Sequence, residues 1–186
     1  MPNKSILTYN KERRIPSLKE RQYIIKSEIN KFKTEEYYNL GDLNWFIKAL
    51  LENQIVLISK EAYSKYKECL FNEKLSKKAN KEELIQLMLE HKSQNIEIAL
   101  KTNAKYVCWE HIVPSVVLYN HLIALDDESI DKAIEYIIQN YGYVCIVSKE
   151  ENKKLNDAHL QQNMPINWKF GDNIFERYKQ VGIEIM

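Results

Sequence analysis

The chain has 186 residues, 45% of them hydrophobic and 28% charged, which is enough for one well-buried core and a small helical subdomain. With 27 basic against 26 acidic residues it has no global positive field, so a nucleic-acid partner would have to bind a local patch. Three cysteines without a CxxC spacing argue against a disulfide framework and a structural zinc site, and no segment approaches the roughly 20 apolar residues that span a bilayer, so we expect a soluble, cytoplasmic protein without membrane contact.

The N-terminal half is predicted to be mainly helical. Ser17 and Glu20 have the spacing of a capping box, and apolar residues follow them at helical intervals. Asp42 is a candidate cap for a second helix with one apolar stripe, and helical spacing recurs over 82–91. We therefore expect residues 1–102 to form a helical N-terminal region.

Two segments share a short pattern, an apolar run followed by Ser-Lys-Glu. They span residues 55–63 and 144–152, and Tyr63 in the first stands where Asn152 stands in the second. Serine after a strand is a common helix N-cap, so the pattern predicts a strand and then a helix in both places. By itself it indicates no catalytic site.

An acid and a histidine, Glu110 and His111, stand near the end of another strand-like run, residues 106–113. β-Branched and aromatic residues fill this run, and Pro114 cannot donate to a central ladder, so the strand is predicted to end near the pair. Neighbouring side chains in a regular strand point to opposite faces. The two residues can therefore share a site only where the strand gives way to a turn.

The C-terminal half continues with alternating helical and strand patterns. Apolar spacing predicts helices over 115–125 and 130–138, and residues 143–148 read as a second strand. Ser148 is the predicted cap of the helix that follows, and a last helix is expected near 173–181. The order is thus strand, inserted helices, strand, helix.

The Glu-His-Ile-Val-Pro string and this order resemble the HNH, or ββα-metal (His-Me finger), nucleases over roughly residues 105–165. The resemblance implies an α+β fold, with a helical N-terminal region outside a ββα-metal core of two antiparallel strands and a helix, and a helical insertion between the strands. Residues 103–186 would hold this core and the C-terminal helix. The inserted helices are longer than the loop of compact HNH domains. Asn140 is the one candidate for the asparagine that braces the first-strand loop.

The resemblance also implies a reaction, the hydrolysis of phosphodiester bonds in DNA, or alternatively RNA, by an endonuclease of restriction, phage defence or toxin type. His111 would be the general base, and Glu110 and Asn152 would hold one divalent ion, Mg²⁺ or Mn²⁺. Asn156 is a candidate additional ligand on the same helix. Phosphate contacts are expected from three cations: Lys153, Lys154 and Arg177.

Two other classes of function stay open from the sequence. The chain fits a catalytically inactive mixed α/β module that binds a protein or nucleic acid, with Glu110 and His111 as an ordinary strand-end pair. A cysteine enzyme would use Cys108 or Cys145 with His111, although both thiols stand in apolar runs typical of buried strands.

Overall fold

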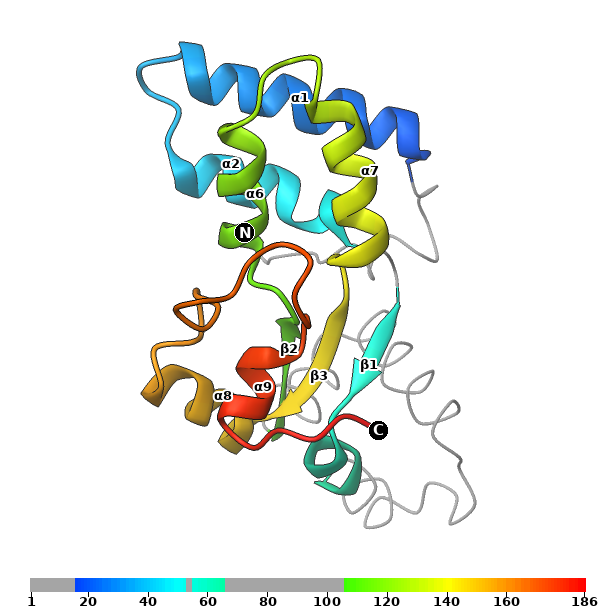
Figure 1. Cartoon of the computed structure of the whole chain (residues 1–186), viewed down its shortest axis with the longest axis vertical. Coiled ribbons are helices and arrows are strands. Elements are labelled where there is room, and N and C mark those ends of the chain that lie inside the picture. Colours follow the sequence, from blue (N-terminus) through cyan, green and yellow to red (C-terminus); the bar gives the residue numbers. More distant parts are fainter. Residues whose placement is uncertain (1–15, 53–54, 66–105) are drawn as a thin grey trace.

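The computed structural model describes residues 16–52, 55–65 and 106–186, which form a helical layer and a sheet layer (Figure 1). Both layers belong to an α+β fold, as the sequence predicts. The helices are α1 (Leu18–Thr34), α2 (Leu40–Ile47), the short 3₁₀ helix η2 (Lys48–Leu51), α6 (Ser115–Ile123), α7 (Ile130–Asn140), α8 (Lys149–Asp157) and α9 (Glu176–Gln180). The strands are β1 (Val56–Ile58), β2 (Val107–His111) and β3 (Val144–Ser148).

The helical layer joins helices from both halves of the chain around one apolar core. The apolar stripes of α1 and α2 pack against those of α6 and α7, which confirms both the helical N-terminal region and the inserted helices (Figure 1). Burial of these stripes, at about 25 cal/mol per Å² of apolar surface, is the force that holds the layer together. Its central buried residues are Ile25, Ile29, Leu43, Ile47, Leu118, Leu122, Ile134 and Ile137.

Capping side chains fix where the first two helices begin. Ser17 and Glu20 form the predicted capping box at the start of α1. Helix α2 begins earlier than predicted, because Asn39 is its cap and accepts hydrogen bonds from the N–H groups of Gly41 and Asp42. The Asp42 carboxylate accepts in return from the N–H of Asn39, so Asp42 is the third helical residue of the box and does not cap the helix itself.

The sheet layer has the strand order β1-β3-β2, with β2 at one edge. Strands β2 and β3 are antiparallel, as predicted, and their register places Glu110 opposite Cys145 and His111 opposite Val144. The predicted Ser148 cap opens α8, where its hydroxyl accepts from the N–H of Glu151. The structure thus contains the strand, strand and helix of the expected core.

A third strand joins this sheet from the segment that was assigned to the N-terminal region. Strand β1 runs parallel to β3, and a helix over 60–65 follows β1 as α8 follows β3. The expected boundary between 102 and 103, like the helix expected over 82–91, lies outside the described residues. Because elements from both sides of that boundary share one helical core and one sheet, the two ranges do not form separate cores.

The C-terminal segment packs against the sheet. Helix α9 begins at Glu176, three residues after Asn173, whose side chain accepts a hydrogen bond from the N–H of Phe175 in the turn before the helix. Gly182 has φ +70° just after α9, the conformation expected of a glycine that ends a helix. Beyond it, Ile185 makes a single antiparallel bridge to Ser59 and no full strand. None of the helices in the described ranges is both long and apolar enough to cross a membrane.

Candidate functional site

The Glu110–His111 pair lies at the last residues of β2, where the chain turns into α6. The N–H of Ile112 still donates to the carbonyl of Tyr143, but Pro114 then takes the cap position of α6 with φ −54° and ψ 135°. Proline lacks an N–H for the ladder and its φ suits a helix entry, so the strand ends as predicted. The pair is therefore held between a sheet edge and the first turn of a helix.

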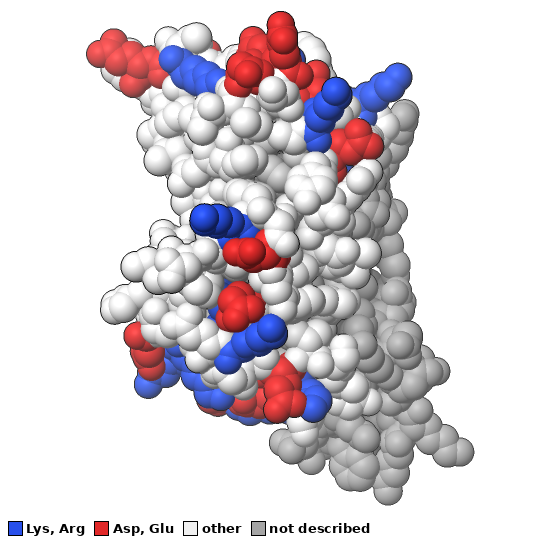
Figure 2. Space-filling view, viewed as in Figure 1, with Lys and Arg blue, Asp and Glu red and all other residues white. Residues whose placement is uncertain are grey.

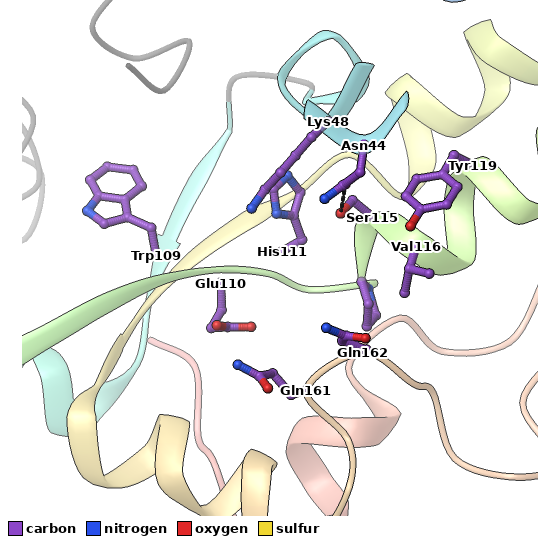
Figure 3. A pocket seen from close by; sticks show the side chains of 11 residues that line it. Asn44, Lys48, Trp109, Glu110, His111, Ser115, Val116, Tyr119, Gln161 and Gln162 are labelled. Atoms are coloured by element: carbon purple, nitrogen blue, oxygen red, sulfur yellow. Dashed lines mark hydrogen bonds between the residues drawn. The ribbon is translucent and has the colours of Figure 1, made fainter. Parts of the chain in front are cut away.

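Both residues line a polar cavity of about 200 Å³ beside β2. In Figure 3, His111 lies on one side of the β2 backbone with Lys48 and Asn44, whereas Glu110 lies on the other side with Gln161 and Gln162. The two side chains keep the alternation of a regular strand and reach one cavity from opposite faces. The remaining lining residues are Trp109, Pro114, Ser115, Val116 and Tyr119.

Glu110 is paired with a cation inside the protein. Its Oε2 atom lies 3.2 Å from Nη2 of Arg177, and only 16% of its side chain is exposed. Arg177 has no exposed surface, and its other donors bond to the main-chain carbonyls of His111, Ile112 and Leu160. The guanidinium therefore fixes the end of β2 and partly neutralises Glu110.

The position of Arg177 corrects its predicted role. We expected a phosphate contact from a surface helix, but a fully buried guanidinium whose donors all meet carbonyls or a carboxylate has none left for a phosphate. Nothing in the sequence indicates this burial, because a short C-terminal helix rich in charge resembles a solvated one. Arg177 therefore holds the end of β2 and is not placed to contact a phosphate.

His111 faces a second acid that the sequence did not single out. Its Nε2 atom lies 3.1 Å from Oε1 of Glu52, and both residues are 7% exposed. The two groups are close without being aligned as a regular hydrogen bond. Glu52 follows η2, and Arg21 of α1 donates to the carbonyls of Glu52 and Leu50, which fixes the backbone there.

The residues expected from α8 do not line the cavity with the pair. Asn152 lies in the first turn of α8, and its Oδ1 atom is buried without a hydrogen-bond partner in the described part of the chain. Asn156, Lys153 and Lys154 are exposed. Glu110 and His111 thus line the same cavity. The feature of α8 that suits a ligand site is the unpartnered Oδ1 atom of Asn152.

A divalent ion fits the chemistry of these oxygens. Mg²⁺ takes oxygen ligands, keeps several waters and needs only one or two protein carboxylates, so the Glu110 carboxylate and the unpartnered Oδ1 of Asn152 suit it in type. Among the described residues there is no group of three or more His, Cys, Asp or Glu that could hold a metal. The candidate ion site is therefore a sparse one, with Glu110 also held by Arg177.

Within the described part of the chain, the positive charge available to a ligand at the cavity comes from a single side chain of the lining and not from an extended basic surface. On the face drawn in Figure 2, acidic and basic groups of the described residues are interspersed and form no continuous basic surface. Lys48 of η2 is exposed and lines the cavity, so it is a cation placed to meet an anionic ligand there. Sequence reasoning missed Lys48 because it stands in an ordinary amphipathic stretch.

The cysteine alternative is not supported by the thiols. Burial raises the pKa of both Cys108 and Cys145 above the usual range, and Cys145 has no exposed surface. A nucleophilic cysteine needs the opposite shift, toward the thiolate. Both cysteines are therefore packing residues of the sheet.

Comparisons of the chain with protein-family models, with curated proteins and with solved structures found no match. The resemblance to HNH nucleases therefore rests on the motif and on the arrangement described above.

Proposed function

We propose that the protein is a metal-dependent endonuclease of HNH type that hydrolyses phosphodiester bonds of DNA or RNA. The observation that carries the proposal is the arrangement of β2, β3 and α8, with an acid and a histidine at the end of β2 on the wall of a polar cavity. Strand, strand and helix in this order, with the Glu-His pair at that place, is the pattern that motivated the family resemblance.

The cavity residues and Asn152, which lies outside the cavity lining, divide the chemistry among them. Neutral His111 accepts a proton from the attacking water, and a positioned base of this kind contributes about 10² to 10⁴ in rate. Lys48 attracts the phosphate into the cavity. Glu110 and Asn152 are the groups that would hold the divalent ion, which supplies charge stabilisation at the phosphate. Arg177 keeps Glu110 and the end of β2 in place.

A second candidate is a catalytically inactive module that binds a protein or nucleic acid. The ion pair between Glu110 and Arg177 favours it, because a carboxylate already neutralised inside the protein is a weaker metal ligand than a free one. The same contacts would then serve only to close the end of β2.

Cleavage assays separate the two candidates. Purified protein is incubated with plasmid, single-stranded DNA and tRNA, with Mg²⁺, with Mn²⁺ and with excess chelator. We expect cleavage with either ion and none with chelator. The replacement His111→Ala should lower the rate by about 10² to 10⁴ without unfolding the protein, since it removes the base. The replacement Asn152→Ala should instead raise the Mg²⁺ concentration required.

Tyr63 supplies the matched control, because it occupies the position of Asn152 in the parallel strand and helix unit and packs beside β1. The replacement Tyr63→Ala should change stability and leave the metal response as it is. Full cleavage in chelator, or equal losses for His111→Ala and Tyr63→Ala in proportion to folded protein, would favour the inactive binding module.

A further inference from the structure

The contact between His111 and Glu52 joins the end of the sheet to the helical layer. Nε2 of His111 lies 3.1 Å from Oε1 of Glu52, and the exposed fractions of the two side chains are 8% and 9%. A carboxylate that is nearly removed from water is costly unless it meets a hydrogen-bond donor or a cation. For the Glu52 carboxylate, the imidazole of His111 is the partner that the structure shows at this distance.

The backbone that carries Glu52 is held from a different element. Arg21, in the first turn of α1 and 7% exposed, donates from Nε to the carbonyl of Leu50 at 2.7 Å and from Nη2 to the carbonyl of Glu52. These donors bond to main-chain carbonyls and leave the Glu52 carboxylate free to face the ring. The backbone from which the Glu52 side chain projects is thus held by α1.

A histidine that acts as a base has two ring nitrogens with different tasks. One must carry the proton and be held by an acceptor, so that the other keeps its lone pair for the substrate side. With Nε2 facing Glu52, the nitrogen left with a lone pair is Nδ1, on a ring that lines the cavity. A contact that is close but imperfectly aligned is common before substrate binds.

We infer that Glu52 is the positioning residue of His111: it holds the proton on Nε2 and orients the ring so that Nδ1 is free to act on water. This inference rests on the proposed function for its catalytic part. Glu52 takes the part expected of Asn140, whose side chain donates instead to the carbonyl of Tyr136 in its own helix, on an exposed surface. The residue that positions His111 is therefore in the helical layer and not in the segment before the second strand.

The tautomer of His111 tests the inference without any assay of activity. Nitrogen NMR of the folded, metal-free protein, at a pH that keeps the ring neutral, should show the proton on Nε2 in the wild type. In Glu52→Ala the proton should redistribute between the two nitrogens. In Glu52→Gln it should stay on Nε2, because the amide oxygen still accepts. An unchanged tautomer in Glu52→Ala would overturn the inference.

Glu28 is the matched control for these variants. It is also a buried glutamate, 6% exposed, but it accepts hydrogen bonds from Lys31 and Tyr38 and lies outside the cavity lining. The replacement Glu28→Ala should lower stability and leave the tautomer of His111 unchanged. A change of tautomer in this variant as large as in Glu52→Ala would show that general loosening, and not the contact, is responsible.

Kinetics then test the catalytic part, normalised to folded protein. The replacement Glu52→Ala should lower kcat by about 10- to 100-fold, the usual cost of losing such a supporting partner, with little change in KM, and Glu52→Gln should recover part of the loss. If the wild type cleaves and Glu52→Ala cleaves equally well, the inference fails and the proposed function stands. If the wild type does not cleave any nucleic acid, the proposed function fails, and with it the catalytic part of the inference, while the tautomer still decides whether Glu52 holds His111.

Discussion

The helical layer and the sheet layer are held together in different ways. The core of the helical layer is apolar, and the buried charges near it, such as Glu28, lie at its margin. The sheet layer buries polar groups at the ends of its parallel strands β1 and β3, where Glu151 accepts from the hydroxyl of Ser59 and from the N–H of Ser148 and so ties the two strand ends together. Apolar contacts are non-directional, whereas hydrogen bonds fix geometry. The sheet layer, which carries Glu110 and His111, is thus the layer in which directional hydrogen bonds fix the positions of buried groups.

Each layer contributes one buried arginine to the site, and the two differ in what they bind. Arg21 bonds to the carbonyls of Leu50 and Glu52 and leaves the Glu52 carboxylate to His111. Arg177 bonds to carbonyls and also to the Glu110 carboxylate. Arg21 therefore holds the backbone of Glu52 and leaves its carboxylate facing the site, whereas Arg177 binds the carboxylate of Glu110 directly. The following variants test whether this difference is real.

The largest loss of stability is expected from Arg177→Met. The change leaves Glu110 without its cation and several buried carbonyls without their donor, which should lower the free energy of unfolding by about 3 to 5 kcal/mol. Urea denaturation followed by circular dichroism measures it. If Arg177→Met lowers the free energy of unfolding by less than Arg21→Met does, the sheet layer does not depend on this guanidinium, and the proposed difference between the two layers is wrong.

A smaller loss is expected from Arg21→Met, about 2 kcal/mol, because this side chain bonds to main-chain carbonyls and not to a carboxylate, and its removal leaves the apolar core of the helical layer in place. Desolvation already lowers the pKa of Arg21, so its burial carries a cost that methionine does not have. The same denaturation series measures the change. The tautomer of His111 in this variant is a second measurement. Without Arg21 the backbone of Glu52 is less well held, so a smaller fraction of His111 should carry its proton on Nε2.

The smallest effect is expected at the margin of the helical layer, from Tyr38→Phe. Burial raises the pKa of Glu28, but hydrogen bonds from Lys31 and Tyr38 outweigh it and bring the pKa below its usual range. A lowered carboxyl pKa stabilises the fold above the unfolded pKa, and the gain is lost as pH falls through the folded pKa. Tyr38→Phe should cost about 1 kcal/mol at neutral pH.

The pH profile of that variant provides its check. Between about pH 6 and pH 3, the wild type should lose more of its free energy of unfolding than Tyr38→Phe, so that the two curves approach each other in acid. Parallel curves over this range would show that Tyr38 does not stabilise the ionised Glu28.

Local patterns in the sequence predicted much of the fold. The capping box at Ser17, the N-cap at Ser148, the apolar stripe of α7 and the end of β2 before Pro114 all depend on residues within a few positions of one another, and the structure confirms each. The pairing of β2 with β3 was also predicted, because a family pattern supplied the one long-range contact that periodicity does not contain. The start of α2 was placed wrongly because Asn39 and Asp42 both suit a cap.

The sequence by itself determined the class of the fold, the helices α1, α6, α7 and α8, the pairing of β2 with β3 and the place of Glu110 and His111 at a strand end, because these follow from side-chain periodicity, from the N–H that proline lacks and from one motif. Only the tertiary structure decided that β1 joins β3, that Glu52 faces His111 and that Arg177 lies buried against Glu110. These contacts join residues far apart in the chain, and a single glutamate or arginine looks the same in sequence whether it is solvated or buried. Which acid meets the histidine depends on how the two layers pack, and that is set by all of their buried surfaces together.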